Sequence, residues 1–357
     1  MIGGIKLKIL HTADIHLKSF GDERWVALET IIGIAKRERI DILAISGDLF
    51  DAEMDTESLR PKIQDVFSNN GFKIVLIPGN HDCTVCQGMY FGSDVTILTN
   101  LAEPFEQDNV RIWGFPFEAI TTEEIIEKLA FLKNKLNKEH INILLHHGEL
   151  LDAFFSRRDF GEEGEQRYLP LKLSYFKDMK LDYVLSGHFH SNFRVWTFDG
   201  GGFFVYPGSP ISITKKETGQ RKLNLFEVGK DPAPYLLETP YFEEIAITLD
   251  PFKEDHPLEI VKEELGKVKP TAHVILMING YINGTKIGMT EDSFAKAVQE
   301  ETKNKCETHF EFKDVKAILE NDLFKSYLEK LETRGFTAER KVQLRDLAIK
   351  AMMESIA

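Results

Sequence analysis

Five short segments place aspartate, asparagine or histidine directly after an apolar run. They are His11-Thr12-Ala13-Asp14-Ile15-His16, Gly47-Asp48, Gly79-Asn80-His81-Asp82, His146-His147-Gly148 and Gly187-His188-Phe189-His190. Carboxylate and amide oxygens and imidazole nitrogens together suit two divalent transition ions such as manganese, iron or zinc. A carboxylate shared by two ions holds them about 3.5–4 Å apart, so that they stabilise the attacking and the leaving oxygen of a phosphoryl displacement. The pattern therefore predicts phosphoester hydrolysis by water whose pKa the metal lowers to about 7.

Alternating strands and helices are expected to position these residues. Short apolar runs predict strands at residues 6–10, 41–46, 72–77, 110–114, 141–145 and 182–186, and a hairpin formed by residues 193–198 and 202–206. In an α/β sheet the carboxyl ends of the strands converge on one crevice. Residues that are far apart in the chain can therefore meet there.

The pattern changes after a proline-containing linker at residues 237–240. It predicts strands at 244–249, 273–282 and 306–312, with helices at 257–268 and 291–302 between them. Two amphipathic helices, broken near Arg334-Gly335, are expected after that. We therefore divide the chain into an α/β domain at 1–240, a small α+β domain at 241–313 and C-terminal helices at 314–357.

Composition limits the class of protein. The chain has 357 residues, 43% hydrophobic and 28% charged, which predicts folded domains with a substantial core. No apolar run is long enough to span a membrane, the first residues do not resemble a signal peptide, and there are only three cysteines, so we expect a cytoplasmic protein. The net charge of −13 has the wrong sign for holding nucleic acid by bulk electrostatics alone. A polyanionic substrate would need local basic patches or metal ions.

The ordered motifs resemble those of the calcineurin-like metallophosphoesterase superfamily, and the resemblance covers about residues 6–215. It implies a β-sandwich of two sheets flanked by helices. Within the superfamily, the chain looks most like the double-strand-break-repair nucleases of the SbcD type. The segments that point to this type are Leu10-His11-Thr12-Ala13-Asp14-Ile15-His16-Leu17, Ser46-Gly47-Asp48-Leu49-Phe50-Asp51 and Tyr206-Pro207-Gly208-Ser209-Pro210. The α+β domain would then correspond to the family's DNA-capping domain.

The resemblance also assigns roles to residues. One metal would be held by Asp14, His16, Asp48 and His190, and the other by Asp48, Asn80, His146 and His188. His146 and His147 are adjacent and either is possible; we choose His146 because it directly follows the apolar run. His81 would be a catalytic acid, with Asp82 orienting it.

Several basic residues are candidate contacts for a substrate phosphate. Lys18 stands where the relatives usually have glycine, and either contacts a substrate phosphate or is a solvated loop residue. The basic clusters Arg157-Arg158 and Lys215-Lys216, the latter near Arg221 and Lys222, either contact the DNA backbone or form ordinary solvated surface. Cys83 and Cys86 have metal or redox spacing, but a second pair is absent, so we favour a plain loop.

The expected function is that of a DNA exonuclease or endonuclease in double-strand-break repair. It would use two divalent metals, with manganese expected and iron or zinc as alternatives. Its partners would be DNA, a second copy of the chain and an SMC-like ATPase of the SbcC type, which the C-terminal helices would bind unless they pack on the chain itself. The alternatives are a phosphodiesterase or phosphatase for nucleotides or phosphoproteins, and a non-catalytic scaffold that binds DNA ends.

Overall fold

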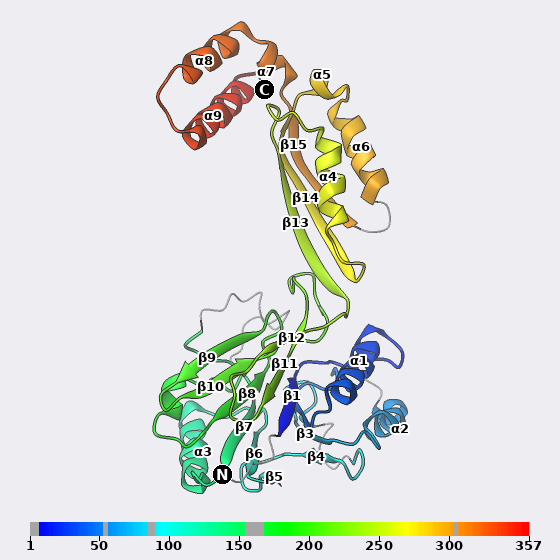
Figure 1. Ribbon diagram of the computed structural model, residues 1–357, viewed down its shortest axis with the longest axis vertical. Coiled ribbons are helices and arrows are strands. Elements are labelled where there is room, and N and C mark those ends of the chain that lie inside the picture. Colours follow the sequence, from blue (N-terminus) through cyan, green and yellow to red (C-terminus); the bar gives the residue numbers. More distant parts are fainter. Residues whose placement is uncertain (1–6, 53–55, 85–89, 154–167, 303–305, 357) are drawn as a thin grey trace. The chain divides into compact units, whose positions relative to one another are not determined.

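The computed structural model describes residues 7–52, 56–84, 90–153, 168–302 and 306–356. Contacts divide the chain into two units, Met1–Phe242 and Glu243–Ala357 (Figure 1). The predicted α+β domain, apart from its first two residues, and the predicted C-terminal helices all belong to the second unit.

The described part of the first unit contains two six-stranded sheets. The first sheet has the strand order β12-β11-β1-β2-β3-β4, and the second has the order β5-β6-β7-β8-β10-β9. The strands of the first sheet are β1 (Lys8–Thr12), β2 (Ile42–Ser46), β3 (Lys73–Ile77), β4 (Val95–Ile97), β11 (Lys222–Glu227) and β12 (Pro234–Leu236). Those of the second are β5 (Phe105–Gln107), β6 (Val110–Phe115), β7 (Ile141–His147), β8 (Tyr183–Gly187), β9 (Arg194–Phe198) and β10 (Gly202–Tyr206). The predicted mixed α/β fold with two sheets is confirmed.

The central strands of each sheet run parallel. Strands β1 to β4 pair in parallel in the first sheet, and β6, β7, β8 and β10 do so in the second. Strands β11, β12, β5 and β9 pair antiparallel at the edges, and β9 and β10 form the predicted hairpin. The carboxyl ends of β1, β2 and β3, and of β7 and β8, thus carry the segments in which the sequence places its polar residues.

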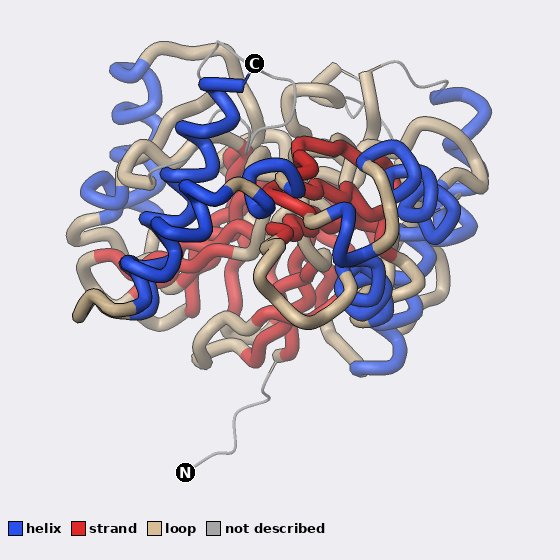
Figure 2. The backbone as a smooth tube through the Cα atoms, turned by 90° about the horizontal axis from the view of Figure 1, so that it is seen from above, coloured by secondary structure: helices blue, strands red, loops and turns tan. Residues whose placement is uncertain are grey.

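Apolar side chains fill three layers of the first unit. Residues such as Ile9, Val75 and Leu185 pack between the two sheets. Helices α1 (Glu23–Glu38) and α2 (Thr56–Phe67) cover the outer face of the first sheet, and α3 (Thr122–Lys135) covers that of the second (Figure 1). The short helix η2 (Leu173–Phe176) packs in the same outer layer as α3. Figure 2 shows helices, in blue, flanking the strands, in red. The central strands are buried on both faces, which is why they read as continuous apolar runs.

The second unit is a three-stranded sheet with helices. Its strands are β13 (Tyr241–Leu249), β14 (Ala272–Ile282) and β15 (Cys306–Asp314), in that order. Helices α4 (Pro257–Gly266) and α6 (Glu291–Thr302) pack on the sheet through Val261, Phe294 and Val298, and α5 (Gly284–Ile287) is a single turn. The three strands and helices α4 and α6 lie where the sequence predicts them, whereas the short helix α5 was not expected.

Three helices, and not the expected two, end the described chain: α7 (Lys316–Glu320), α8 (Asp322–Glu332) and α9 (Ala338–Ile356). The additional break is at Asn321, whose side chain accepts a hydrogen bond from the Leu323 amide at 2.9 Å and so begins α8. The helices share a small apolar core that includes Phe324 and Ile349 and contacts Phe252.

None of the helices within the described residues has both the length and the apolar character that crossing a bilayer requires.

Candidate metal centre

The predicted polar residues converge at the carboxyl ends of strands from both sheets. Asp14 and His16 follow β1, Asp48 follows β2, and Asn80 and His81 follow β3. From the second sheet, β7 ends at His147, and His188 and His190 follow β8. Six of these side chains are buried, namely Asp14, His16, Asp48, His147, His188 and His190. The two sheets thus contribute to one buried polar site.

The backbone of the site is strained. Asp14, His16, Asp48 and His188 have φ angles of 55°, 50°, 49° and 89°, in the region that favours glycine. Each such residue costs of order 1–3 kcal/mol and persists only where its surroundings hold it. The Asp14 and His16 amides donate to the carbonyls of Gly47 and Asp48 at 3.1 and 3.0 Å. The loops after β1 and β2 therefore hold each other in a conformation that aims their side chains inward.

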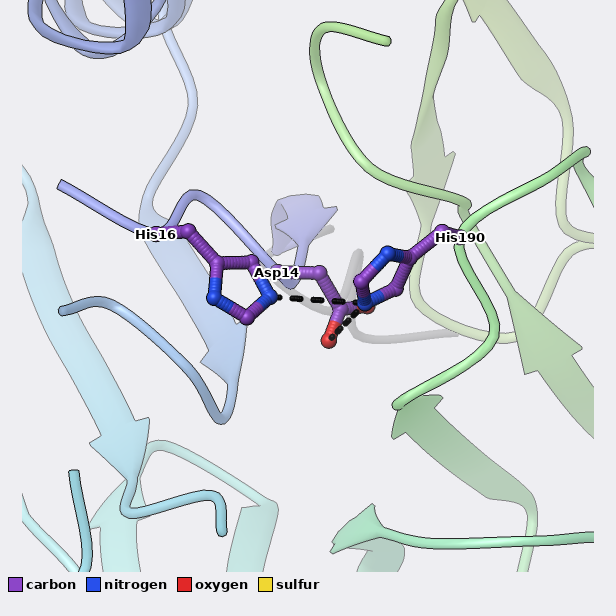
Figure 3. Close-up of side chains that lie close together, drawn as sticks. All are labelled: Asp14, His16 and His190. Carbon is purple, nitrogen blue, oxygen red and sulfur yellow. Dashed lines mark hydrogen bonds and ion pairs between the residues drawn. The ribbon is translucent and has the colours of Figure 1, made fainter. Parts of the chain in front are cut away.

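Asp14, His16 and His190 form a first group of ligand atoms (Figure 3). His16 Nε2 lies 3.3 Å from His190 Nε2, and His190 Nε2 lies 3.8 Å from an Asp14 carboxylate oxygen. Burial lowers the pKa of His16 to about 3, so its ring is neutral at physiological pH. Two imidazole nitrogens and a carboxylate oxygen thus face one another.

The backbone of His16 is held from outside this group. Arg24, in the first turn of α1, donates to the His16 carbonyl at 2.7 Å and forms an ion pair with Asp51 at 2.7 Å. A cation is electrostatically unfavourable at a helix N-terminus, so these two contacts account for the arginine there.

A second group forms around Asp48, Asn80 and His147. The His147 Nδ1–H donates to the carbonyl of Ser46 at 2.8 Å, which turns Nε2 towards the Asn80 side-chain oxygen at 2.9 Å and the Asp48 carboxylate at 3.2 Å. The ring of His188 lies edge-on to that of His147, with a centroid distance of 5.4 Å. The Nε2 atom and two acceptor oxygens converge here, an arrangement that requires a proton or another cation between them.

The pKa shifts reflect this requirement. Burial lowers the pKa of His147, but the negative charge of Asp48, its hydrogen bond and the charge of Asp14 outweigh burial and raise the pKa to about 10. Burial alone would raise the pKa of Asp48, but the charge and hydrogen bond of His147 lower it well below its usual range. A positive charge at this position therefore stabilises the buried carboxylates.

Asp48 connects the groups. Ligand atoms lie within 4.8 Å of one another in three sets: Asp14, His16 and His190; His16, Asp48 and His81; and Asp14, Asp48 and His147. Buried carboxylate and imidazole donors that share a central carboxylate fit two divalent ions. The geometry is therefore consistent with the predicted bridging position of Asp48.

His81 lies at the edge of this arrangement. Its amide donates to Asp48 at 2.9 Å, and its ring packs edge-on against that of His16 at a centroid distance of 4.7 Å. Its side chain is only partly buried, as is that of Asn80, whereas the carboxylates and the other imidazoles of the centre are buried. His81 can therefore be reached by a molecule that approaches the centre.

The choice of His146 over His147 is contradicted by the geometry. The two ring nitrogens of His146 hydrogen-bond to the Ser186 hydroxyl at 2.9 Å and the Leu169 carbonyl at 3.1 Å. Its ring packs near Phe115 and Phe204 on the outer side of the second sheet. Side chains alternate between the two faces of a strand, so His147 points to the centre and His146 away from it.

Asp82 holds the loop after β3. Its carboxylate accepts hydrogen bonds from the Gly79 amide at 2.6 Å and the Phe50 amide at 3.2 Å. Burial, and then the charge of Asp48, raise the pKa of Asp82 to about 7. This link between two loops was not expected from the sequence, and the orientation of His81 by Asp82 stays a prediction.

The basic residues divide into exposed and buried ones. Lys18, Lys215 and Lys216 are exposed, whereas Arg157 and Arg158 lie outside the described residues, as does Cys86. Arg221 is not a surface residue as its basic cluster suggested. It is 2% exposed, and its guanidinium donates to main-chain carbonyls, including those of Ser209 and Ser191, each at 2.9 Å.

Three contributions to the site had no signal in the sequence. They are the Ser46 carbonyl at His147, the Arg24 contact to His16, and Glu217, whose carboxylate lies 3.4 Å from His190 Nδ1. Each depends on tertiary proximity, and a main-chain carbonyl cannot be identified from residue type.

Gly47 provides a test of the packing around His147. Gly47 has a φ of 90°, and an added Cβ would overlap the His147 ring, so we expect Gly47→Ala to displace His147 and reduce the metal content by about one ion per chain. Gly200 has a φ of 102° but nothing within 4 Å of an added Cβ. Gly200→Ala should cost about 1–2 kcal/mol of stability and leave the metal content unchanged. Elemental analysis and thermal unfolding of both variants would check this; equal metal content in the two would contradict it.

The adjacent histidines can be separated by a paired substitution. His147→Ala should remove a donor and lower the metal content. His146→Ala should keep the metals but lower stability by about 1–3 kcal/mol, because the Leu169 carbonyl and Ser186 hydroxyl lose their partner. Metal loss in His146→Ala without metal loss in His147→Ala would reverse the assignment.

Comparisons with known proteins agree with this architecture. Residues 7–192 match the family model described as calcineurin-like phosphoesterase. A curated relative, the SbcD component of the nuclease SbcCD of Staphylococcus saprophyticus, is 25% identical over 60% of this chain and 64% of its own length. Another, "DNA double-strand break repair protein Mre11" of Saccharolobus solfataricus, is 24% identical over 69% of this chain and 65% of its own length. The match thus spans somewhat less than two thirds of each relative.

Among solved structures, the chain resembles TT1561 of Thermus thermophilus with a TM-score of 0.41 and 15% identity, over 62% of this chain and 98% of that one. The family model covers more than half of the chain and includes all the strand ends that form the centre. The chain belongs to the calcineurin-like phosphoesterase family.

Proposed function

We propose that the protein is a metal-dependent DNA nuclease that hydrolyses phosphodiester bonds. The observation that carries the proposal is the buried group of carboxylate and imidazole donors with the partly exposed His81 at its edge. The two curated relatives, named as a component of a nuclease and as a DNA double-strand-break repair protein, support DNA as the substrate.

The donors divide into two sets in this proposal. Asp14, His16, Asp48 and His190 would hold one ion, and Asp48, Asn80, His147 and His188 the other, with manganese as the expected metal. Divalent ions bound by these residues would supply Lewis-acid chemistry and a water nucleophile at neutral pH. The chain's own contribution is to fix the donors in place and to exclude bulk water from them.

His81 would act as the general acid. A ring nitrogen of His81 lies within 4.8 Å of ligand atoms of His16 and Asp48. Its side chain is only partly buried, so an incoming phosphodiester can reach it. Its amide hydrogen bond to Asp48 fixes the backbone from which the ring projects. A protonated imidazole there would donate its proton to the leaving oxygen of the broken strand.

The same centre would serve a phosphodiesterase or phosphatase for nucleotides or phosphoproteins. The second unit, Glu243–Ala357, favours a macromolecular substrate, because a small phosphate ester does not need an additional sheet with helices. A non-catalytic scaffold that binds DNA ends would need neither the full donor set nor an imidazole beside it.

Exposed apolar side chains on the C-terminal helices support the proposal of a protein partner. Leu323 of α8 and Leu347 of α9 are 75% and 63% exposed, and Phe336 between these helices is 48% exposed. The helices therefore pack on their own unit through one face and leave apolar side chains on another. The proposed partner is an SMC-like ATPase of the SbcC type in the cytoplasm, with the nuclease itself as a homodimer.

His81→Asn tests the enzyme and its substrate together. We expect the wild type with Mn²⁺ to degrade linear duplex DNA, and His81→Asn to keep its metals while turnover falls about 10²–10⁴-fold, through loss of general acid catalysis. Bis-p-nitrophenyl phosphate, cyclic nucleotides and phosphopeptides would be assayed in parallel. Hydrolysis of these small esters without DNA degradation would favour the phosphodiesterase or phosphatase, and no hydrolysis by metal-loaded protein would favour the scaffold.

The partner surface can be tested with charge substitutions. Leu323→Glu combined with Leu347→Glu should abolish binding to the SbcC-type ATPase of the same cell and leave DNA hydrolysis by the isolated protein unchanged, because an apolar contact would be replaced by buried charge. Ile126→Glu is a matched control, since Ile126 of α3 is 49% exposed in the first unit. Co-purification would measure binding. Equal binding by all variants would show that the ATPase binds a different surface of the protein.

A further inference from the structure

The imidazole of His190 lies between two buried carboxylates. Its Nε2 atom faces Asp14 at 3.8 Å, and its Nδ1 atom faces Glu217 at 3.4 Å. We propose that Glu217 is a positioning residue, which fixes the orientation and tautomer of His190 so that its Nε2 lone pair points into the metal centre. The inference rests on the metal centre of the proposed function and adds a residue that does not itself touch the metal.

Glu217 is held rigidly. It is completely buried, and its two carboxylate oxygens accept hydrogen bonds from the Ile213 amide at 2.9 Å and from the hydroxyls of Ser209 and Thr214, each at 3.1 Å. These three contacts fix the carboxylate within its own loop. The remaining contact is with His190, which comes from the loop after β8.

This contact selects one tautomer of His190. A deprotonated carboxylate only accepts hydrogen bonds, so the proton of a neutral ring is favoured on Nδ1, next to Glu217. Nε2 then carries a lone pair and faces Asp14 and His16, as Figure 3 shows. A histidine that ligates a metal through one nitrogen commonly donates its other N–H to a carboxylate or carbonyl, which fixes the ring and raises its basicity.

Arg221 connects the loop of Glu217 to the loop of His190. Its guanidinium is buried and donates to the main-chain carbonyls of His190, Ser191 and Ser209. The negative charge of Glu217 also stabilises the buried positive charge of Arg221, which would be costly in apolar surroundings. A purely structural role for Glu217 is therefore the competing explanation, and the experiment must separate the two.

The second group provides an internal comparison. His147 is oriented by the neutral carbonyl of Ser46, and its Nε2 atom faces Asn80 and Asp48, not Glu217. Loss of the Glu217 charge should therefore weaken binding of the ion held by His190 and leave binding of the ion held by His147 almost unaffected. A general loss of stability would weaken metal binding at both sites.

The experiment compares Glu217→Gln with Asp41→Asn. Glutamine keeps the size of glutamate but loses the charge. Asp41 is a control carboxylate that accepts a main-chain hydrogen bond from Lys8 at 2.7 Å at the start of β2, at the other end of the strands from the metal centre. Measurements are Mn²⁺ binding by calorimetry, thermal unfolding without metal, and the tautomer of His190 from long-range proton–nitrogen correlation spectra of the metal-free protein.

We expect Glu217→Gln to remain folded, to bind one of its two Mn²⁺ ions about 10–100-fold more weakly, and to lose the Nδ1–H preference of His190. Asp41→Asn should bind both ions as the wild type does. Asn80→Ala removes a donor of the second site and should leave one site that binds Mn²⁺ strongly. Glu217→Gln combined with Asn80→Ala should lower the affinity of that remaining site.

Three results would overturn the proposal. Unchanged affinity for both ions in Glu217→Gln, with the tautomer preserved, would show that Glu217 does not position His190. An equal loss at both sites, in step with a lower unfolding temperature of the metal-free protein, would make its role structural. Absence of Mn²⁺ binding by the wild type would reject the metal centre itself, which is a failure of the proposed function and is distinguishable from the other two.

Discussion

Two carboxylates, Asp14 and Asp48, are completely buried at the ends of neighbouring strands. Burial raises the pKa of Asp14 to about 6, and the charge of Asp48 adds to this, while His190 and His147 act in the opposite direction. Taking such charges out of water is costly unless positive charge lies close to them. The arrangement of the surrounding histidines, strained loops and glycines follows from the need to hold these acids together and compensate their charge.

The double-layered fold meets this need because it fixes strand ends accurately. Parallel strands of one sheet bring Asp14 and Asp48 side by side, and the second sheet brings His147, His188 and His190 to the same position. The packed layer between the sheets leaves little freedom for one sheet to shift against the other. A site built from both sheets thus gains rigidity from the core without needing donors that are near in sequence.

Much of this could be predicted from the sequence, because apolar runs identified the central strands and the polar residues after them identified the donors. The choice of His146 over His147 was wrong because β7 continues to His147. Side chains alternate along the strand, so His146 lies on the face of Leu144, away from the centre. From the sequence, Arg221 was placed in a basic surface cluster and Glu217 was not singled out, because an isolated charge is rarely buried. Their burial and their hydrogen-bond partners depend on the fold around them, and no local pattern encodes that.

The two histidines of the first group are supported in parallel ways. Arg24, from the first turn of α1, holds the carbonyl of His16, and Arg221, just before β11, holds that of His190. Each arginine fixes the backbone of a donor from outside the group, and the Nε2 atoms of both rings face the centre. A catalytic arrangement must be held within a fraction of an ångström before substrate arrives. Placing these cations on main-chain oxygens achieves this without putting another positive charge in competition with the metals.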